Sequence, residues 1–361
     1  MTTYIGAENI ISPLGNSSQE NFSQVKNGVS GISLFKNIGV GKEDLHLSKI
    51  KSLPDKNKFD YLLLNCLKSV SSLSNDIINS ENTIVIISTT KADIQENLAN
   101  PILSSIKKLV SDFNLVHTPL VISNACISGV LAMNTANNLI QTKVYKHAFV
   151  VGADVISDFV LYGFQSLYAI SDAPAQPFDK ERKGITLGEG AAGVLMSSDI
   201  AAFKNEPLEF IEGTSSNDAN HISGPSRTGE GLFRAVSKTL DLANVTASDI
   251  DFISAHGTGT LFNDEMESIA FDRLAMNDTP LNSLKGCFGH TLGAAGLIET
   301  AISMQSVRNN TLIKSLGYQT VGTSGRINIL TENIEKEVTT ILKTASGFGG
   351  CNASAIIRQL K

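Results

Sequence analysis

Short apolar runs rich in β-branched residues alternate along this chain with longer stretches of helical periodicity. The apolar runs are bounded by turn residues, as buried strands usually are, and they cover residues 83–89, 119–123, 148–152, 250–254 and 339–345. The helical stretches cover residues 62–73, 101–113, 128–139, 231–242, 264–275 and 292–307. This alternation predicts an α/β fold with layers of helices on a sheet and largely parallel strand pairing.

A weak internal symmetry divides the chain into two related halves. In the first half a short strand runs directly into a helix start at 124–129, and in the second half a similar strand leads into the small residues at 289–296. The segments that best fit the connection between the halves are 171–190 and 198–207. We expect one compact unit with halves 1–203 and 204–361, each offering a helix N-terminus to a shared site.

Composition narrows the class of protein. The chain has 361 residues, of which 42% are hydrophobic and 18% charged, and its net charge is −6. These values suit a soluble globular protein and argue against nucleic acid as a partner. The first residues lack a basic segment followed by an apolar run, and nowhere do about 18 uncharged apolar residues occur in a row. We therefore expect no membrane span and a cytoplasmic location.

Four cysteines, none in a CxxC pair, favour reduced thiols, and Cys126 stands in a distinctive place among them. It follows an apolar strand and precedes a helix, so the turn would lift its sulfur out of the sheet. The first N–H groups of the helix would stabilise a thiolate and lower the thiol pKa from its free value of about 8.5. The alternative is a small buried hydrophobe, the common role of a lone cysteine.

Two histidines lie downstream in glycine-rich settings. His256 follows the strand at 250–254 and begins a turn, His-Gly-Thr-Gly-Thr, whose glycines let the backbone approach a ligand and whose hydroxyls can bind polar groups. Its place at the carboxyl end of a strand is where α/β sheets build their sites. His290 precedes a helix of very small residues. The alternatives are a loop histidine bound by backbone for His256, and close helix packing as the reason for the small residues after His290.

Cys126, His256 and His290 are together compatible with several kinds of chemistry. A zinc site is chemically reasonable for this set, but the residues show none of the short paired spacings of common zinc sites, so we expect no metal. A thiol hydrolase would use one histidine and an orienting carboxylate or amide. Two neutral imidazole N–H donors are better suited to holding a developing enolate oxyanion, which favours acyl transfer.

Six ordered motifs make the chain resemble the β-ketoacyl-acyl-carrier-protein synthases, which are condensing enzymes of the thiolase-like superfamily. The resemblance covers nearly the whole length and implies a layered αβαβα fold of two related halves. The motifs are Ile11-Ser-Pro-Leu-Gly15, Asn124-Ala-Cys126, Gln176-Pro-Phe-Asp-Lys-Glu-Arg-Lys-Gly-Ile-Thr-Leu-Gly-Glu-Gly-Ala191, His256-Gly-Thr-Gly-Thr260, the stretch 285–296 and Gly347-Phe-Gly-Gly-Cys-Asn352.

The resemblance implies decarboxylative Claisen condensation in the elongation of fatty acid, polyketide or polyene chains. Cys126 would carry the growing acyl chain as a thioester, while His256 and His290 would bind malonyl thioester and promote loss of carbon dioxide. The resulting carbanion would attack the thioester, whose oxyanion would be met by the backbone N–H groups of Cys126 and Phe348. Phe348 also matches the gate between the acyl and malonyl sides, although core packing is its simpler role.

Further residues take roles from the same resemblance. Lys285 matches the family's active-site lysine, and Glu267 and Glu299 would be its supporting acids. Thr258 and Thr260 match positions that bind the pantetheine arm, although turn capping is their simpler role.

The resemblance also implies partners. No cofactor belongs to the chain itself, because the phosphopantetheine arm is carried by an acyl carrier protein. Lys180, Arg182 and Lys183 could dock this acidic partner, although an ordinary solvated turn explains them as well. The chain would form a homodimer, or a heterodimer with a ketosynthase-like chain-length factor that lacks the cysteine.

Several positions depart from the family pattern and bear on substrate rather than on reaction. Asn124 stands where Thr is usual, Ser346 replaces an aromatic residue, Cys351 replaces Thr, and the segment 31–82 is short. The short form and the string 284–290 are most similar to ketosynthases of aryl-polyene or flexirubin-type pigment clusters.

Two other functions stay open. A thiolase also uses cysteine and histidine but adds a second reactive cysteine near the C-terminus, for which Cys351 would be the candidate. A partner subunit of the chain-length-factor type would shape the tunnel of a neighbour without elongating chains, but such subunits lose the nucleophile that this chain keeps as Cys126.

Overall fold

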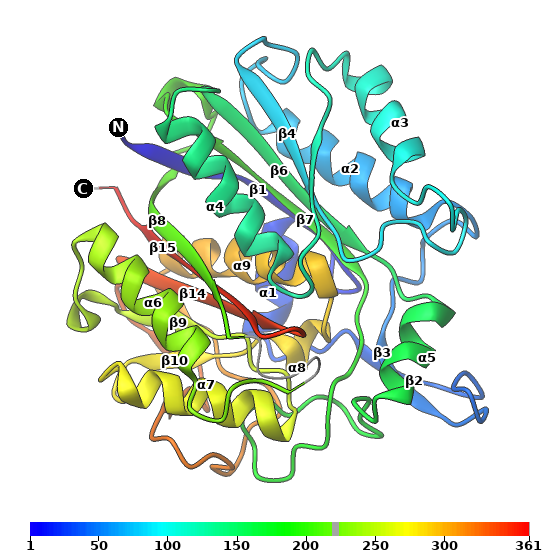
Figure 1. Cartoon of the computed structure of the whole chain (residues 1–361), viewed down its shortest axis with the longest axis vertical. Coiled ribbons are helices and arrows are strands. Elements are labelled where there is room, and N and C mark those ends of the chain that lie inside the picture. Colours follow the sequence, from blue (N-terminus) through cyan, green and yellow to red (C-terminus); the bar gives the residue numbers. More distant parts are fainter. Residues whose placement is uncertain (219–223, 361) are drawn as a thin grey trace.

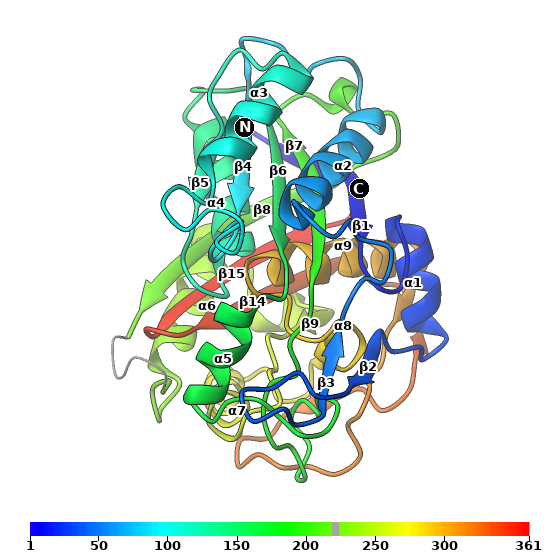
Figure 2. The same cartoon turned by 90° about the vertical axis from the view of Figure 1, so that its right-hand side faces the viewer.

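The central feature of the fold is a mixed sheet of eleven strands (Figures 1 and 2). The computed structural model describes residues 1–218 and 224–360, and the sheet lies within them. From edge to edge its strands are β12 (Asn328–Ile329), β10 (Pro280–Asn282), β9 (Phe252–Ser254), β14 (Thr340–Gly347), β15 (Cys351–Arg358), β8 (Leu208–Asn217), β1 (Thr3–Ile11), β7 (Gly190–Ser197), β6 (His147–Asp154), β4 (Thr83–Ser88) and β5 (Leu120–Ile122).

The strand order repeats in the two halves of the chain. Read toward the middle, the first half runs β5, β4, β6, β7, β1. In the second half β12 lies at the edge, and the five strands inside it run β10, β9, β14, β15, β8. If these five strands of each half are counted in sequence, without β12, both orders are third, second, fourth, fifth, first. The two first strands, β1 and β8, pair antiparallel and join the halves, with Ile5 opposite Leu208. The boundary at 203/204 stays a prediction, and it falls just before β8 begins.

The pairing directions correct one expectation. Strands pair in parallel only toward the two edges, in β5–β4–β6 and in β12–β10–β9–β14. Every pair between β14 and β6, across the middle, is antiparallel. The prediction of largely parallel pairing is therefore wrong for the centre. Strands β14 and β15 are joined by a tight turn, and a tight turn can only connect antiparallel neighbours.

Helices cover the sheet in three layers. The middle layer packs between the two halves of the sheet and consists of α4 (Ser128–Gln141) and α9 (Ala295–Arg308), most of whose residues are buried. One outer layer, against β4, β6 and β7, consists of α2 (Lys58–Ser72) and α3 (Leu103–Phe113). The other, against β9, β14 and β15, consists of α6 (Glu230–Ala243) and α7 (Leu261–Arg273). The expected αβαβα order is thus present, and the six predicted helices have ends within about one helical turn of the observed ones.

Smaller elements complete the chain. The hairpin of β2 (Ile32–Phe35) and β3 (Leu45–Ser48) and helix α5 (Asp158–Ser166) share a separate apolar cluster beside the middle layer. The others are α1 (Ser18–Lys26), α8 (Lys285–Phe288), β11 (Thr311–Leu312), β13 (Ile334–Glu335) and the short turns η1 (Ile200–Ala202), η2 (Ala247–Asp249) and η3 (Leu292–Ala294). Within the described ranges, no helix combines the length and the hydropathy that crossing a membrane requires.

The two middle helices cross where each carries a glycine. A methyl group on Gly129 would lie 3.0 Å from the backbone nitrogen of Leu297, and one on Gly296 would lie 2.9 Å from that of Val130. The small residues after His290 therefore allow close helix packing, as the simpler interpretation of these residues predicted. Because this contact sets the start of both helices, it also places the groups that precede them.

We expect Gly296→Ala to lower the free energy of unfolding by about 1–3 kcal/mol, since the new methyl group must push backbone aside. Gly163→Ala is the matched control, because Gly163 lies in helix α5 with no atom within 4 Å of a new methyl group. That control should stabilise the protein by roughly 0.5–1 kcal/mol through helix propensity. Urea denaturation of both variants measures the difference, and equal effects would contradict the tight crossing.

Candidate active site

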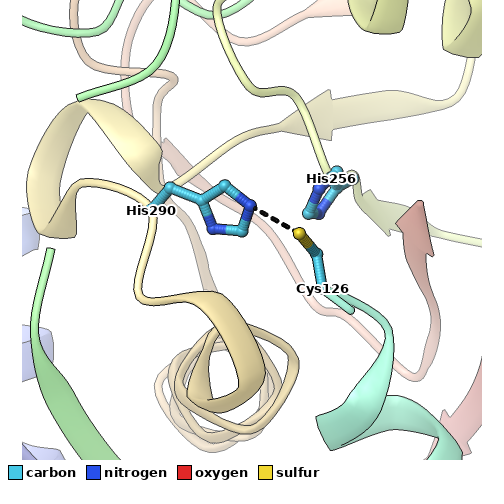
Figure 3. A group of neighbouring side chains, drawn as sticks. All are labelled: Cys126, His256 and His290. Carbon is cyan, nitrogen blue, oxygen red and sulfur yellow. Dashed lines mark hydrogen bonds between the residues drawn. The ribbon is translucent and has the colours of Figure 1, made fainter. Parts of the chain in front are cut away.

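Cys126 occupies a strained turn between a strand and a helix. Strand β5 ends at Ile122, helix α4 begins at Ser128, and Ala125 between them has a φ of 44°, which is unusual for a residue other than glycine. The Ser128 hydroxyl accepts a hydrogen bond from the Asn124 N–H at 2.8 Å and donates one to the Ala125 carbonyl at 2.7 Å. These bonds hold the turn, and the sulfur of Cys126 points into a cavity (Figure 3).

The two histidines meet this sulfur from the other half of the chain. The Nε2 atom of His290 lies 3.0 Å from the Sγ atom of Cys126, and the rings of His256 and His290 form an edge-to-face pair 5.1 Å apart (Figure 3). His256 follows strand β9. His290 follows helix α8, and its loop is fixed by hydrogen bonds from the His290 N–H to the Thr186 carbonyl and from the Gly188 N–H to the His290 carbonyl. Three segments far apart in sequence thus form one buried site.

Hydrogen bonds at the other ring nitrogens fix the protonation of both histidines. The backbone N–H of Leu292 donates to Nδ1 of His290 at 3.2 Å, and the Lys285 ammonium lies 3.3 Å from Nδ1 of His256. An acceptor nitrogen carries no proton, so each neutral ring holds its proton on Nε2. Burial, and next the Lys285 charge, keep the pKa of both histidines well below the ordinary value. The site therefore presents two neutral Nε2–H donors.

A metal does not fit this protonation. The possible ligand atoms of Cys126, His256 and His290 lie within 4.8 Å of one another, so their distances alone would allow a metal ion. A histidine that ligates metal usually donates its second N–H to an acceptor, whereas here both second nitrogens face donors. The Lys285 ammonium adds a positive charge beside His256, which also disfavours a cation.

Lys285 lies under His256 and pairs with Glu299. Its ammonium donates to Oε1 of Glu299 at 2.6 Å and to the His256 carbonyl at 2.8 Å, in addition to Nδ1 of His256. Glu299 binds a second lysine through its other oxygen, because Lys343 donates to Oε2 at 2.6 Å. Lys343 was not predicted as a site residue from the sequence. The signal was a charged residue inside an otherwise apolar strand pattern, which is rare unless the charge is paired.

Glu267 lies elsewhere than expected. Its carboxylate accepts hydrogen bonds from the backbone N–H groups of His256 at 2.9 Å and Gly257 at 2.6 Å, rather than from Lys285. Asp264, one helical turn earlier on α7, accepts in the same way from the N–H groups of Thr258 and Phe178. Burial, and next the neighbouring Asp264, raise the pKa of Glu267 to about 7. These two acids shape the loop that carries His256.

The cavity in front of Cys126 has a volume of about 380 Å³, and the predicted binding residues line it. Thr258 and Thr260 share a hydrogen bond of 2.9 Å between their hydroxyls, and Thr260 also caps helix α7 by accepting from the Asn263 N–H. Phe348, in the turn between β14 and β15, stacks on Phe164 of α5 with ring centroids 5.5 Å apart. The threonines therefore combine the capping role with access to the cavity.

Burial changes the expected state of the nucleophile. It raises the pKa of the Cys126 thiol to about 12, and the opposing Lys285 charge is the smaller effect. The resting residue is therefore a thiol, not the thiolate that the helix N-terminus was expected to stabilise.

Two other sequence interpretations change with the structure. Cys351 does not line the cavity, and its Sγ donates to the Phe348 carbonyl at 3.3 Å, within the turn. Arg182 is buried and binds the carbonyls of Asp179 and Thr260, so it cannot dock a partner, whereas Lys180 and Lys183 are exposed.

The chain is similar in sequence to known proteins. Residues 210–319 match the family model of the β-ketoacyl synthase C-terminal domain, and residues 108–202 match that of the N-terminal domain. The 3-oxoacyl-[acyl-carrier-protein] synthase 2 of Rhizobium meliloti is 34% identical over 250 residues, which are 65% of this chain and 59% of the relative. The tetracenomycin polyketide synthase ketoacyl synthase alpha subunit of Streptomyces glaucescens is 31% identical over 257 residues, 67% of this chain and 60% of the relative. The chain spans about 60% of the length of these curated relatives.

Solved structures resemble the whole chain. One is a ketosynthase from Xenorhabdus doucetiae, solved in complex with its chain length factor, with a TM-score of 0.86 at 24% identity. The match covers 99% of this chain and 98% of the ketosynthase chain. Another is a ketosynthase of a type II polyketide system, solved in complex with its acyl-carrier protein, with a TM-score of 0.90 at 20% identity. The match covers 100% of this chain and 99% of the solved chain. The predicted thiolase-like fold is thereby confirmed.

Proposed function

We propose that this chain, which belongs to the β-ketoacyl synthase family, condenses an acyl group on Cys126 with malonyl-acyl-carrier protein and releases carbon dioxide. The observation that carries the proposal is the placement of the Cys126 sulfur 3.0 Å from Nε2 of His290 with both imidazoles neutral and protonated at Nε2. Such donors suit the stabilisation of an oxyanion and do not suit removal of the thiol proton, because neither Nε2 atom has a free lone pair.

The reaction begins with transfer of the acyl group from a carrier thioester to Cys126. The new bond joins the Cys126 sulfur to the acyl carbon, the bond to the pantetheine sulfur breaks, and the thiol proton leaves with the released pantetheine thiol. The cavity residues Thr258 and Thr260 would bind the pantetheine arm, which belongs to the carrier, so the chain needs no cofactor of its own. The stacked Phe348 would separate the acyl side from the malonyl side.

Condensation follows on the same sulfur. The Nε2–H groups of His256 and His290 bind the malonyl thioester oxygen, the bond to the carboxylate breaks, and its electron pair forms an enolate as carbon dioxide leaves. The enolate carbon attacks the Cys126 thioester, and the carbon–sulfur bond breaks. The sulfur leaves as a thiolate and takes up one proton from solvent, which the reaction consumes, while the carrier keeps a β-ketoacyl chain two carbons longer.

The partners follow from the same proposal. An acyl carrier protein delivers both substrates, and a second ketosynthase-like chain forms a homodimer or, as a chain-length factor, a heterodimer. Strand β5 is an edge strand of the sheet and ends shortly before Cys126 in the sequence. Its exposed Leu120 and Val121 suit pairing of this edge with another chain. All four cysteines are free thiols in the structure, which suits a reducing cytoplasm.

The test is incubation with malonyl carrier and a panel of carriers loaded with saturated, aryl and polyene acyl groups, followed by product mass spectrometry. We expect a product two carbons longer and one carbon dioxide per condensation, and the preferred panel member assigns the pathway. Carrier elongation without carbon dioxide release would indicate a thiolase. Absence of both product and acyl adduct would indicate a partner subunit that does not elongate chains.

A further inference from the structure

A second buried lysine completes an ionic bridge behind the two histidines. Lys343 on strand β14 donates to Oε2 of Glu299, and Lys285 donates to Oε1 of the same carboxylate, both at 2.6 Å. The side chains of these three residues are between 1% and 4% exposed. Glu299 is thus held between two ammonium groups that come from different elements, α8 and β14.

The remaining hydrogen bonds of Lys343 end on the backbone that carries His256. Its ammonium donates to the Ser254 carbonyl at 3.1 Å and lies 3.4 Å from the Ala255 carbonyl. Lys285 donates to the next carbonyl, that of His256, at 2.8 Å. The two lysines therefore bind three consecutive carbonyls at the end of β9. The Glu299 carboxylate binds both lysines and so links them to each other.

A structural role alone does not account for this arrangement. A buried ion pair is a poor source of stability, because replacing its members by apolar residues of similar size is often neutral or favourable. Strand β14 is otherwise buried and rich in small and apolar residues, so an apolar side chain would suit position 343. Burial lowers the pKa of Lys343, and the attraction of Glu299 opposes that effect. Placing the charged Lys343 side chain in this buried position therefore costs desolvation free energy.

The formal charges of the bridge point to the reaction. Lys285 and Lys343 carry two positive charges and Glu299 one negative charge, which leaves one positive charge behind His256. The other ionisable groups that face it are Glu267, His290 and Cys126. The Lys285 and Lys343 charges both favour a neutral His256, and the positive charge of the bridge stabilises a negative charge that develops in front of the imidazoles. Glu267 offsets part of this charge when it is ionised.

We propose that Lys343 is a positioning residue for the decarboxylation step, acting through Glu299 and Lys285 on the orientation and protonation of His256. The inference rests on the proposed function. Lys343 touches neither the cavity nor Cys126, so the transfer of an acyl group to Cys126 depends on it much less than decarboxylation does.

The experiment compares two half-reactions in Lys343→Met, which keeps the length of the side chain and removes its charge. We expect the rate of malonyl-carrier decarboxylation to fall by roughly 10- to 100-fold, by analogy with the loss seen when a residue that orients a metal-ligating histidine is removed. Formation of the acyl adduct on Cys126 should change much less, because Lys343 lines no part of the cavity in front of the sulfur. Lys343→Gln, which can still donate to Glu299, should recover part of the lost rate and keeps the test valid if the Met variant folds poorly.

A double-mutant cycle tests the route. If Lys343 acts through Glu299, then Lys343→Met in a Glu299→Gln background should have less than about threefold further effect, because the bridge is already broken. Independent effects that multiply would overturn the route. Lys108→Met is the control, because Lys108 pairs with the buried Asp60 in the outer helix layer and should leave decarboxylation unchanged.

A measurement without substrate separates this inference from the proposed function. Nitrogen-15 spectra of the protein labelled at its six histidines report the tautomer and pKa of each ring. In Lys343→Met we expect the pKa of His256 to rise toward its ordinary value, whereas Lys108→Met should leave it in place. An unchanged His256 signal with unchanged decarboxylation would overturn the role of Lys343. If Lys343→Met shows the predicted shift of the His256 pKa while the wild-type protein condenses nothing, only the proposed function is refuted.

Discussion

Cys126→Ala is expected to abolish condensation, with a loss of about 10⁴-fold or more, because no other group can hold the acyl chain. Intact-mass spectra of the variant with acyl-loaded carrier should show no adduct, whereas the wild type should gain the mass of one acyl group. The two Nε2–H donors of His256 and His290 remain in place. Decarboxylation of malonyl carrier should therefore persist in the variant, which separates the nucleophile from the oxyanion donors.

Two other cysteines provide the controls for this result. Cys66→Ala removes another buried thiol, from helix α2 outside the cavity lining, and should keep adduct formation while costing roughly 1 kcal/mol of stability for the small void. Cys351→Ala separates the synthase from a thiolase, because Cys351 belongs to the turn of Phe348 and does not line the cavity. A loss of activity in Cys351→Ala as complete as in Cys126→Ala would contradict the condensing mechanism.

The sequence predicted the elements that carry strong local signals. A strand, a small-residue turn and a helix around Cys126 were expected, and the structure has them in that order. The four central strands β1, β7, β8 and β15 were missed, because each contains several small or polar residues and so lacks a continuous apolar pattern. The wrong prediction of parallel pairing at the centre follows from these missed strands, because the strands that were predicted belong mostly to the parallel edges of the sheet.

The finer arrangement of the site depended on three-dimensional position. Glu267 and Glu299 lie on different helices, and spacing could not show that one binds backbone and the other binds lysines. The protonation of His290 depends on the Leu292 N–H, which donates to its Nδ1, and Leu292 itself has a φ of 53°. Nothing in the residue order indicates that conformation. Long-range contacts of this kind are set by packing rather than by local preference.

His290→Ala should lower malonyl-carrier decarboxylation by about 10²- to 10³-fold, which is the usual loss when one preorganised oxyanion donor is removed. The acyl adduct on Cys126 should still form, since His290 donates to the sulfur and does not take its proton. His147→Asn is the control: His147 is buried on β6, where its ring bonds the Ser197 hydroxyl away from the site.

The pH dependence of decarboxylation tests the same donors without mutation. The pKa of His256 and of His290 is held well below the ordinary 6.5, so both rings stay neutral as the pH falls through 6.5. Acidification must first break the Leu292 or Lys285 contact at Nδ1 before a ring can gain a second proton. Stopped-flow measurement of carbon dioxide release should therefore show no titration near pH 6.5 that is lost in His290→Ala. Protonation of Glu267, whose pKa is about 7, is the other change in this pH range, and it is retained in that variant. A decline centred near pH 6.5 in the wild type, absent from His290→Ala, would show that His290 takes up a proton there and would refute the neutral tautomer on which the mechanism depends.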